Sequence, residues 1–131
     1  MSAKIFFYWI ARLVAAIIMV QTLYFKFSGS EESVYIFSII GIEPWGRIGV
    51  GVMELIASLL LILSATAWLG SLLAIGLMMG AITMHLTILG IEVKGDGGYL
   101  FILSLIVTIC SAYVLYIDRA KVIQVWKYFC S

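Results

Sequence analysis

The sequence has 131 residues, of which 64% are hydrophobic and 11% are charged, and its formal net charge is +1. Soluble domains are about 45–50% apolar and about 25% charged, and a small domain has too much surface to bury such an excess. The composition therefore excludes an ordinary water-soluble domain and predicts a single membrane-embedded unit. Without a basic stripe, nucleic acid is excluded as a partner.

Four long apolar runs follow one another along the chain. A helix needs about 20 residues to cross roughly 30 Å of hydrocarbon, and each run is long enough. The runs are continuous rather than alternating, which disfavours transmembrane strands. The predicted spans cover about residues 5–27, 47–68, 69–91 and 99–117. We predict an all-α fold, an integral membrane four-helix bundle made by one transmembrane domain, residues 1–131.

The first span and the segment after it are distinct in kind. Residues 5–27 exceed the apolar core of a signal peptide and include Arg12, so we predict a retained span. A polar turn follows, and then residues 34–43 are apolar but too short to cross the bilayer. Aromatic side chains such as Tyr35 and Phe37 suit the headgroup level, which predicts an interfacial segment.

The second and third spans have almost no residues between them. The sequence therefore predicts a tight antiparallel pair that turns near Trp68–Gly70. Small residues allow helices to approach closely inside membranes. We assign helix packing to Gly76 and Gly80, which form a GxxxG motif, and to Gly51.

Glu54 is the one charged residue between Gly51 and Trp68. A carboxylate at the centre of a bilayer costs about 2.5–3.5 kcal/mol on the insertion scale, so it requires a partner or a proton. Glu54 and His85 lie about 10 Å and about 9 Å below the same end of adjacent spans. We expect the two side chains to meet in a buried polar cluster in the outer half of the bundle, joined by Lys26 or Arg47.

Two interpretations of these side chains remain open. Ionisable groups inside a membrane are candidates for proton relay or ligand binding, and imidazole titrates near neutral pH. Alternatively, His85 is a neutral hydrogen-bonding group and Glu54 a structural ion-pair partner. Arg12, about 10 Å into its span, either extends toward Asp118 or points into the bundle.

Other chemistries find little support in the sequence. With one histidine and no cysteine cluster, no metal or haem site is predicted, and Cys110 and Cys130 are interpreted as free thiols. The stretch EVKGDGG, residues 92–98, lacks the spacing of a phosphate loop and predicts a turn into the fourth span. Without a serine elbow, paired catalytic carboxylates or a nucleotide fingerprint, enzymatic activity stays undecided.

Basic residues near the span ends predict the orientation, because cytoplasmic loops carry an excess of Lys and Arg. If both termini share one side, that side has four such residues and the opposite side has three. The two sets are Lys4, Arg119, Lys121 and Lys127 against Lys26, Arg47 and Lys94. This bias favours cytoplasmic termini, with residues 118–131 as a cytoplasmic tail.

Three stretches of the sequence, together with the fourth span, resemble a known family of proteins. The three stretches are LYFKFSGSEESVYIF (23–37), EPWGRIGVGVMELIASLLL (43–61) and GAITMHLTILGIEVKGDGG (80–98). On these residues nearly the whole chain resembles the DoxX-like family of small bacterial membrane proteins. The resemblance implies a four-helix protein of the bacterial inner (cell) membrane. The polar positions carried over are Arg12, Lys26, Arg47, Glu54 and His85.

The resemblance also implies a range of functions. Relatives are associated with quinone-linked sulfur oxidation, methylamine utilisation or redox homeostasis. The first expectation is that the polar cluster binds a small quinone-like or amphipathic molecule and serves a redox-linked membrane complex, with a quinone as the implied cofactor. The alternatives are a non-catalytic scaffold or accessory subunit, as a homo-oligomer or with a redox partner, and a transporter of small solutes or protons. The lipid bilayer is a partner in every case.

Overall fold

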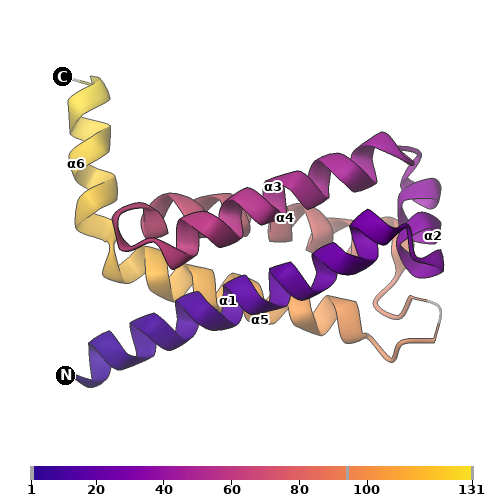
Figure 1. Cartoon of the computed structure of the whole chain (residues 1–131), viewed down its shortest axis with the longest axis horizontal. Coiled ribbons are helices and arrows are strands. Elements are labelled where there is room, and N and C mark those ends of the chain that lie inside the picture. Colours follow the sequence, from indigo (N-terminus) through magenta and orange to yellow (C-terminus); the bar gives the residue numbers. More distant parts are fainter. Residues whose placement is uncertain (1, 94, 131) are drawn as a thin grey trace.

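The computed structural model describes residues 2–93 and 95–130. Four long helices run side by side and no strand occurs in these residues (Figure 1). They are α1 (Ala3–Ser28), α3 (Trp45–Ile62), α4 (Ala67–Met84) and α5 (Tyr99–Ile117). Two short turns extend α4 into one segment, the 3₁₀-helix η1 (Ser64–Thr66) before it and the π-helix η2 (His85–Leu89) after it. The four segments are long and apolar enough to cross a membrane, which confirms an all-α membrane bundle.

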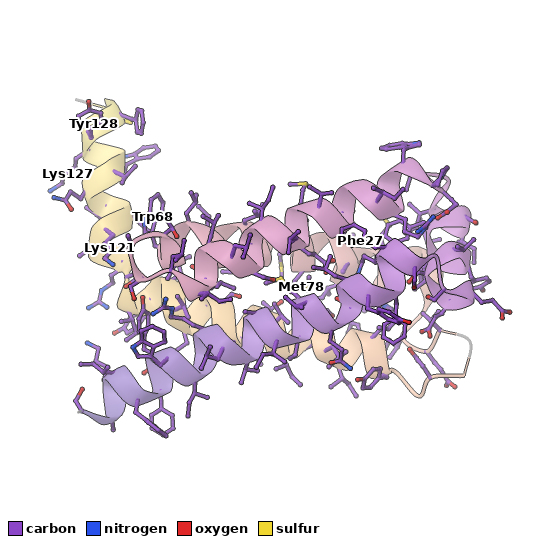
Figure 2. The ribbon with its side chains drawn as sticks, viewed as in Figure 1. Phe27, Trp68, Met78, Lys121, Lys127 and Tyr128 are labelled. Atoms are coloured by element: carbon purple, nitrogen blue, oxygen red, sulfur yellow. The ribbon has the colours of Figure 1, made fainter. Side chains whose placement is uncertain are left out.

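The interior of the bundle is built from small side chains. Helices in a bilayer gain nothing from hiding apolar surface from lipid, so close van der Waals contact between small residues holds them together. The buried core consists of Ala11, Ala15, Met19, Ala57, Leu61, Ala67, Ala74, Met78, Val107 and Val114. The outer faces expose large apolar side chains, including Ile17, Leu59 and Ile109 (Figure 2 shows the side chains along the bundle). This inverted pattern suits a lipid surrounding.

The turn between the second and third spans lies earlier than the sequence predicted. The expected boundary at residues 68–69 is replaced by a break at residues 63–66, where α3 ends and η1 begins. Leu63 is extended, with ψ 124°, and the Thr66 hydroxyl donates to the Leu60 carbonyl at 3.0 Å. Hydroxyl side chains compete in this way for the terminal carbonyls of a helix and favour its end.

The segment after the first span is a helix of its own. Ser30 caps α2 (Glu31–Ile40) by accepting the backbone N–H of Ser33 at 3.2 Å. Gly41 ends the helix at φ 91°, a conformation that favours glycine. Helix α2 lies across the end of the bundle opposite both termini (Figure 1). Ser33 and Phe37 are buried, so α2 covers that end of the bundle.

The loop before α5 is a turn organised by Asp96. Its Oδ1 accepts the backbone N–H groups of Val93 at 3.0 Å and Gly98 at 2.8 Å, and its Oδ2 accepts that of Leu100 at 3.4 Å. Burial raises the pKa of Asp96, but the backbone hydrogen bonds together outweigh it and the pKa lies below its ordinary value. The glycine-rich stretch therefore positions a carboxylate that caps α5.

The chain ends in helix α6 (Arg119–Cys130), which turns sharply away from α5 at the end of the bundle that also carries the N-terminus (Figure 1). None of its residues is buried. Trp126 and Phe129 are exposed, and Lys121 and Lys127 are labelled on it in Figure 2. Aromatic and basic side chains together are typical of the membrane interface.

Candidate functional site

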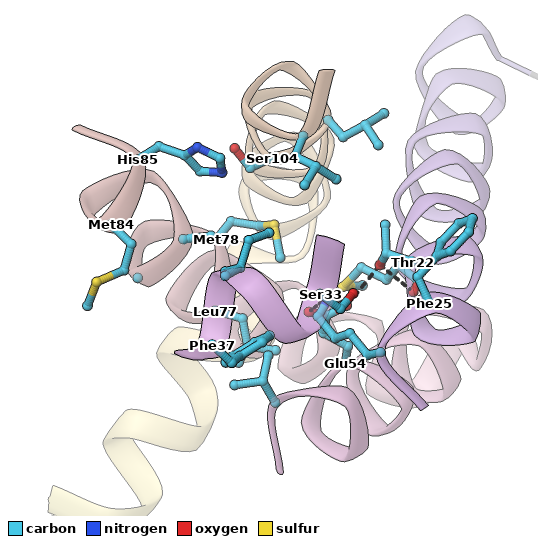
Figure 3. A pocket seen from close by; sticks show the side chains of 18 of the residues that line it. Thr22, Phe25, Ser33, Phe37, Glu54, Leu77, Met78, Met84, His85 and Ser104 are labelled. Atoms are coloured by element: carbon cyan, nitrogen blue, oxygen red, sulfur yellow. Dashed lines mark hydrogen bonds and ion pairs between the residues drawn. The ribbon is translucent and has the colours of Figure 1, made fainter. Parts of the chain in front are cut away.

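A cavity of about 460 Å³ lies beneath α2, between α1, α4 and α5. Its walls are mostly apolar, formed by side chains such as Phe37, Leu77 and Met78 (Figure 3). Gly76, Gly80 and Tyr99 line it and are exposed, so the cavity is open along the bundle side. The polar lining side chains are Gln21, Thr22, Lys26, Ser30, Glu32, Ser33, Glu54, His85, Tyr99 and Ser104.

Glu54 projects from the middle of α3 toward α1 and is 3% exposed. Its Oε1 lies 3.1 Å from Nζ of Lys26, and Oγ of Thr22 lies 3.1 Å from its Oε2. The Thr22 hydroxyl has a single proton, which it can donate either to Glu54 or to the Met19 carbonyl, 2.9 Å away. Thr22 and Lys26 are four residues apart and therefore share one face of α1. Between Lys26 and Arg47, the structure identifies Lys26 as the partner of Glu54.

Arg47 forms a separate contact. Its Nε lies 2.9 Å and 3.0 Å from the two carboxylate oxygens of Glu43, one helical turn earlier. Its Nη1 donates to the backbone carbonyl of Lys26. Arg47 therefore joins the end of α1 to the start of α3 and is not among the residues that line the cavity. The role of Glu43 was missed, although its i, i+4 spacing from Arg47 is a recognisable signal.

His85 begins the π-helix η2 and is 5% exposed. Its Nδ1 lies 3.0 Å from the Gly90 carbonyl, and its ring meets the Phe101 ring edge-on, with centroids 5.6 Å apart. Within the described residues no hydrogen bond joins His85 to Glu54, so the expected direct contact is wrong. A π-turn is wider than an α-turn, and here its histidine packs on α5. Both side chains line the same cavity from different sides (Figure 3).

The glycines divide between two roles. A Cβ on Gly76 or Gly80 would meet no atom within 4 Å outside its own helix backbone, and both residues line the cavity. They leave space there instead of packing a helix pair, which corrects the GxxxG expectation. Gly51 does pack closely, since a Cβ would lie 2.8 Å from the Phe27 ring. Gly70 also packs closely and brings α4 against α3, where a Cβ would lie 2.7 Å from the Leu61 nitrogen.

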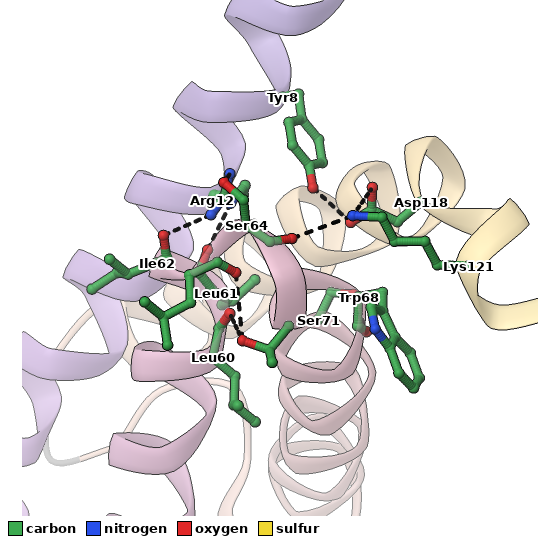
Figure 4. Close-up of polar contacts among 12 residues, drawn as sticks. Tyr8, Arg12, Leu60, Leu61, Ile62, Ser64, Trp68, Ser71, Asp118 and Lys121 are labelled. Carbon is green, nitrogen blue, oxygen red and sulfur yellow. Dashed lines mark hydrogen bonds and ion pairs between the residues drawn. The ribbon is translucent and has the colours of Figure 1, made fainter. Parts of the chain in front are cut away.

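Arg12 belongs to a second polar cluster at the other end of the bundle (Figure 4). It is fully buried, and its Nε and Nη2 donate to the carbonyls of Leu61 at 2.6 Å and Ile62 at 2.7 Å. These are terminal carbonyls of α3, which lack partners within the helix. Asp118 is instead bound by the Tyr8 hydroxyl at 2.6 Å. Arg12 therefore points into the bundle and caps α3.

The arrangement has the chemistry of a binding site. The described residues contain no group of three His, Cys, Asp or Glu side chains that could hold a metal ion. Cys110 and Cys130 are free thiols. An apolar cavity with a few polar groups suits a molecule with an apolar body and a small polar head.

Comparison with known proteins identifies one family. The DoxX family model matches residues 7–87, which is more than half of the chain. The matched region contains Arg12, Lys26, Arg47, Glu54 and His85. No curated protein and no solved structure matches the chain. The chain belongs to the DoxX family of membrane proteins.

Proposed function

We propose that this protein binds a small amphipathic, quinone-like molecule in the cavity and serves a redox-linked complex of the bacterial inner membrane. The main observation in support of this proposal is that Glu54 and His85, both buried, line one apolar cavity of about 460 Å³. Pockets for small molecules typically measure about 300–1,000 Å³ and combine apolar walls with a few polar groups. A lipid-soluble carrier has matching chemistry.

The position of the opening supports entry from the membrane. Gly76 and Gly80 lie inside α4, a membrane-spanning segment, and both are exposed on the cavity wall. A molecule dissolved in the acyl chains enters there without crossing a headgroup layer. The Lys26–Glu54 pair lies at another part of the wall, where it supplies an ammonium donor and a carboxylate acceptor to a polar head.

We also propose that both termini are cytoplasmic. Lys4, Arg119, Lys121 and Lys127 belong to the end of the bundle that carries the termini, whereas Lys26 and Arg47 at the other end are engaged by Glu54 and Glu43. Positive residues accumulate on the cytoplasmic side.

A second candidate function is that of an accessory subunit that recruits a partner. One observation favours it: α6 exposes Trp126, Tyr128 and Phe129 beyond the bundle, and none of its residues is buried. Exposed aromatic residues contribute strongly to protein interfaces as well as to membrane anchoring. Both functions are compatible with one ligand-binding bundle.

Filling the cavity from the glycine wall is expected to abolish ligand binding. In Gly76→Leu the new side chain enters open space, because no atom lies within 4 Å of its Cβ position. We expect labelling by a photoreactive benzoquinone with a short alkyl tail, measured by mass spectrometry in lipid nanodiscs, to fall at least about tenfold, since the occupied volume is lost to the ligand.

Gly49→Leu is the matched control. Gly49 also has no atom within 4 Å of its Cβ position, but it lies on α3 and does not line the cavity. Its labelling is expected to equal that of the unmodified protein. Equal labelling of Gly76→Leu and Gly49→Leu, both competed by unlabelled quinone, would contradict the proposed site.

A further inference from the structure

The hydrogen bond of His85 fixes its tautomer. Its Nδ1 lies 3.0 Å from the Gly90 carbonyl oxygen, and a carbonyl only accepts. Nδ1 must therefore carry the proton. In a neutral imidazole the other nitrogen, Nε2, then carries a lone pair and acts as an acceptor. Gly90 adopts φ 80°, which favours glycine and orients this carbonyl toward the ring.

The second nitrogen of His85 is available to a ligand. Nε2 makes no hydrogen bond to any residue that the structure describes, although the side chain is only 5% exposed. His85 lines the cavity, and Figure 3 shows its ring directed toward Ser104 on α5. Nε2 is therefore accessible from the cavity, where a hydrogen-bond donor on a ligand can reach it.

Ser104 adds to the same wall without supplying a donor. It is 5% exposed, and its hydroxyl donates to the Phe101 carbonyl at 2.6 Å. Its single proton is used there, so its oxygen offers the cavity only lone pairs. His85 and Ser104 each use their proton in a hydrogen bond to a backbone carbonyl. The wall that they form therefore offers the cavity two acceptors and no donor.

We infer that this wall selects a ligand whose polar head donates a hydrogen bond, the hydroxyl of a phenol or hydroquinone, over a head that only accepts. The inference rests on the proposed function and specifies its ligand as the reduced, hydroxyl-bearing form. A hydroxyl placed here satisfies Nε2. A head that offers only a carbonyl or ether oxygen leaves both acceptors unpaired and binds more weakly, so a quinone probe still labels the cavity but is displaced more readily by a hydroxyl-bearing ligand.

A phenol and its methyl ether test this selection directly. The probes are para-nonylphenol and para-nonylanisole, which share the tail and ring but differ in the hydroxyl proton. Each competes with the photoreactive benzoquinone in nanodiscs at about pH 8. We expect the phenol to compete roughly tenfold more effectively than the ether, the discrimination of one good hydrogen bond.

Variants locate the effect at His85. In His85→Phe, which has a ring of similar shape and no acceptor, the phenol and the ether are expected to compete equally. Ser104→Ala, which removes only the second acceptor, is expected to retain most of the preference and serves as a folded reference. A preference that persists unchanged in His85→Phe overturns the assignment to His85.

Two outcomes of the competition experiment distinguish binding in the cavity from selection for a hydroxyl. Equal competition by phenol and ether in the unmodified protein, with the quinone still bound, overturns the selection for a hydroxyl and leaves the cavity site standing. Absence of labelling and of competition by any probe overturns both.

Discussion

Arg12→Leu is expected to lower the free energy of unfolding by roughly 2–6 kcal/mol, the cost of leaving two buried acceptors without donors. Arg12 is fully buried, and it donates to the carbonyls of Leu61 and Ile62 and to the Ser64 hydroxyl at 3.3 Å. Its positive charge also interacts favourably with the negative, C-terminal end of the α3 dipole. The guanidinium further stacks on Trp9, 3.9 Å from the ring centroid. The free energy is measured by titrating sodium dodecyl sulfate into mixed micelles, followed by circular dichroism.

Arg12→Lys is the informative comparison. Lysine keeps the charge but has no planar fork, so it cannot serve two carbonyls and an aromatic face in the same geometry. We expect its stability to lie between those of the unmodified protein and Arg12→Leu. If Arg12→Leu is as stable as the unmodified protein, Arg12 does not cap α3.

Lys26→Met is expected to destabilise the bundle by about 3–5 kcal/mol, because it leaves a buried carboxylate without its counter-charge. Glu54 extends from the middle of α3 and its side chain is only 4% exposed, so little of it is open to solvent. Glu54→Gln is expected to cost less, about 1–3 kcal/mol. Lys26 lies in the last turn of α1, and its flexible ammonium group can extend to the interface.

The double variant Lys26→Met/Glu54→Gln provides the control, because it removes both charges together. We expect it to be more stable than Lys26→Met, so that the two changes are not additive. Unfolding free energies in the same micelles complete the double-mutant cycle. Additive effects of equal size would show that the ion pair is not the interaction that stabilises Glu54.

The spans were predictable from the sequence because hydrophobic length depends on composition alone. Four segments suffice to cross a membrane, as expected, since apolar runs of this length have few stable alternatives in a bilayer. The break after Ile62 was not predictable in this way. Leu63 is as apolar as its neighbours, and the signal lies in the hydroxyls of Ser64 and Thr66, which hydropathy does not register.

The residues that form the site were predictable from the sequence, but only some of the contacts between their side chains were. Lys26 or Arg47 was expected to join Glu54, and the structure shows that Lys26 does. Depth along adjacent helices, from one rise per residue, placed His85 beside Glu54, but depth carries no information on which neighbour a side chain faces. The π-turn at His85 and its bond to Gly90 direct the ring to α5. Gly76 and Gly80 were wrongly assigned to helix packing, because a GxxxG motif has the same sequence whether it lies on a packed helix face or on a cavity wall.

These contacts give the two ends of the bundle different roles. At the end with the termini, Arg12, Tyr8 and Asp118 join α1, α3 and the start of α6 through fully paired polar groups. At the other end, α2 covers a cavity that is lined by Glu54 and His85, and the Nδ1 of His85 is bound to the Gly90 carbonyl.

The cavity site can be tested with a crystal structure grown from a lipidic phase that contains a short-chain hydroquinone. We expect density for a ring in the cavity, with a hydroxyl within hydrogen-bonding distance of His85 Nε2 and the tail leaving past Gly76 and Gly80. Density for an acyl chain alone, or a cavity closed by its own side chains while quinone is bound elsewhere, would contradict the proposed cavity site.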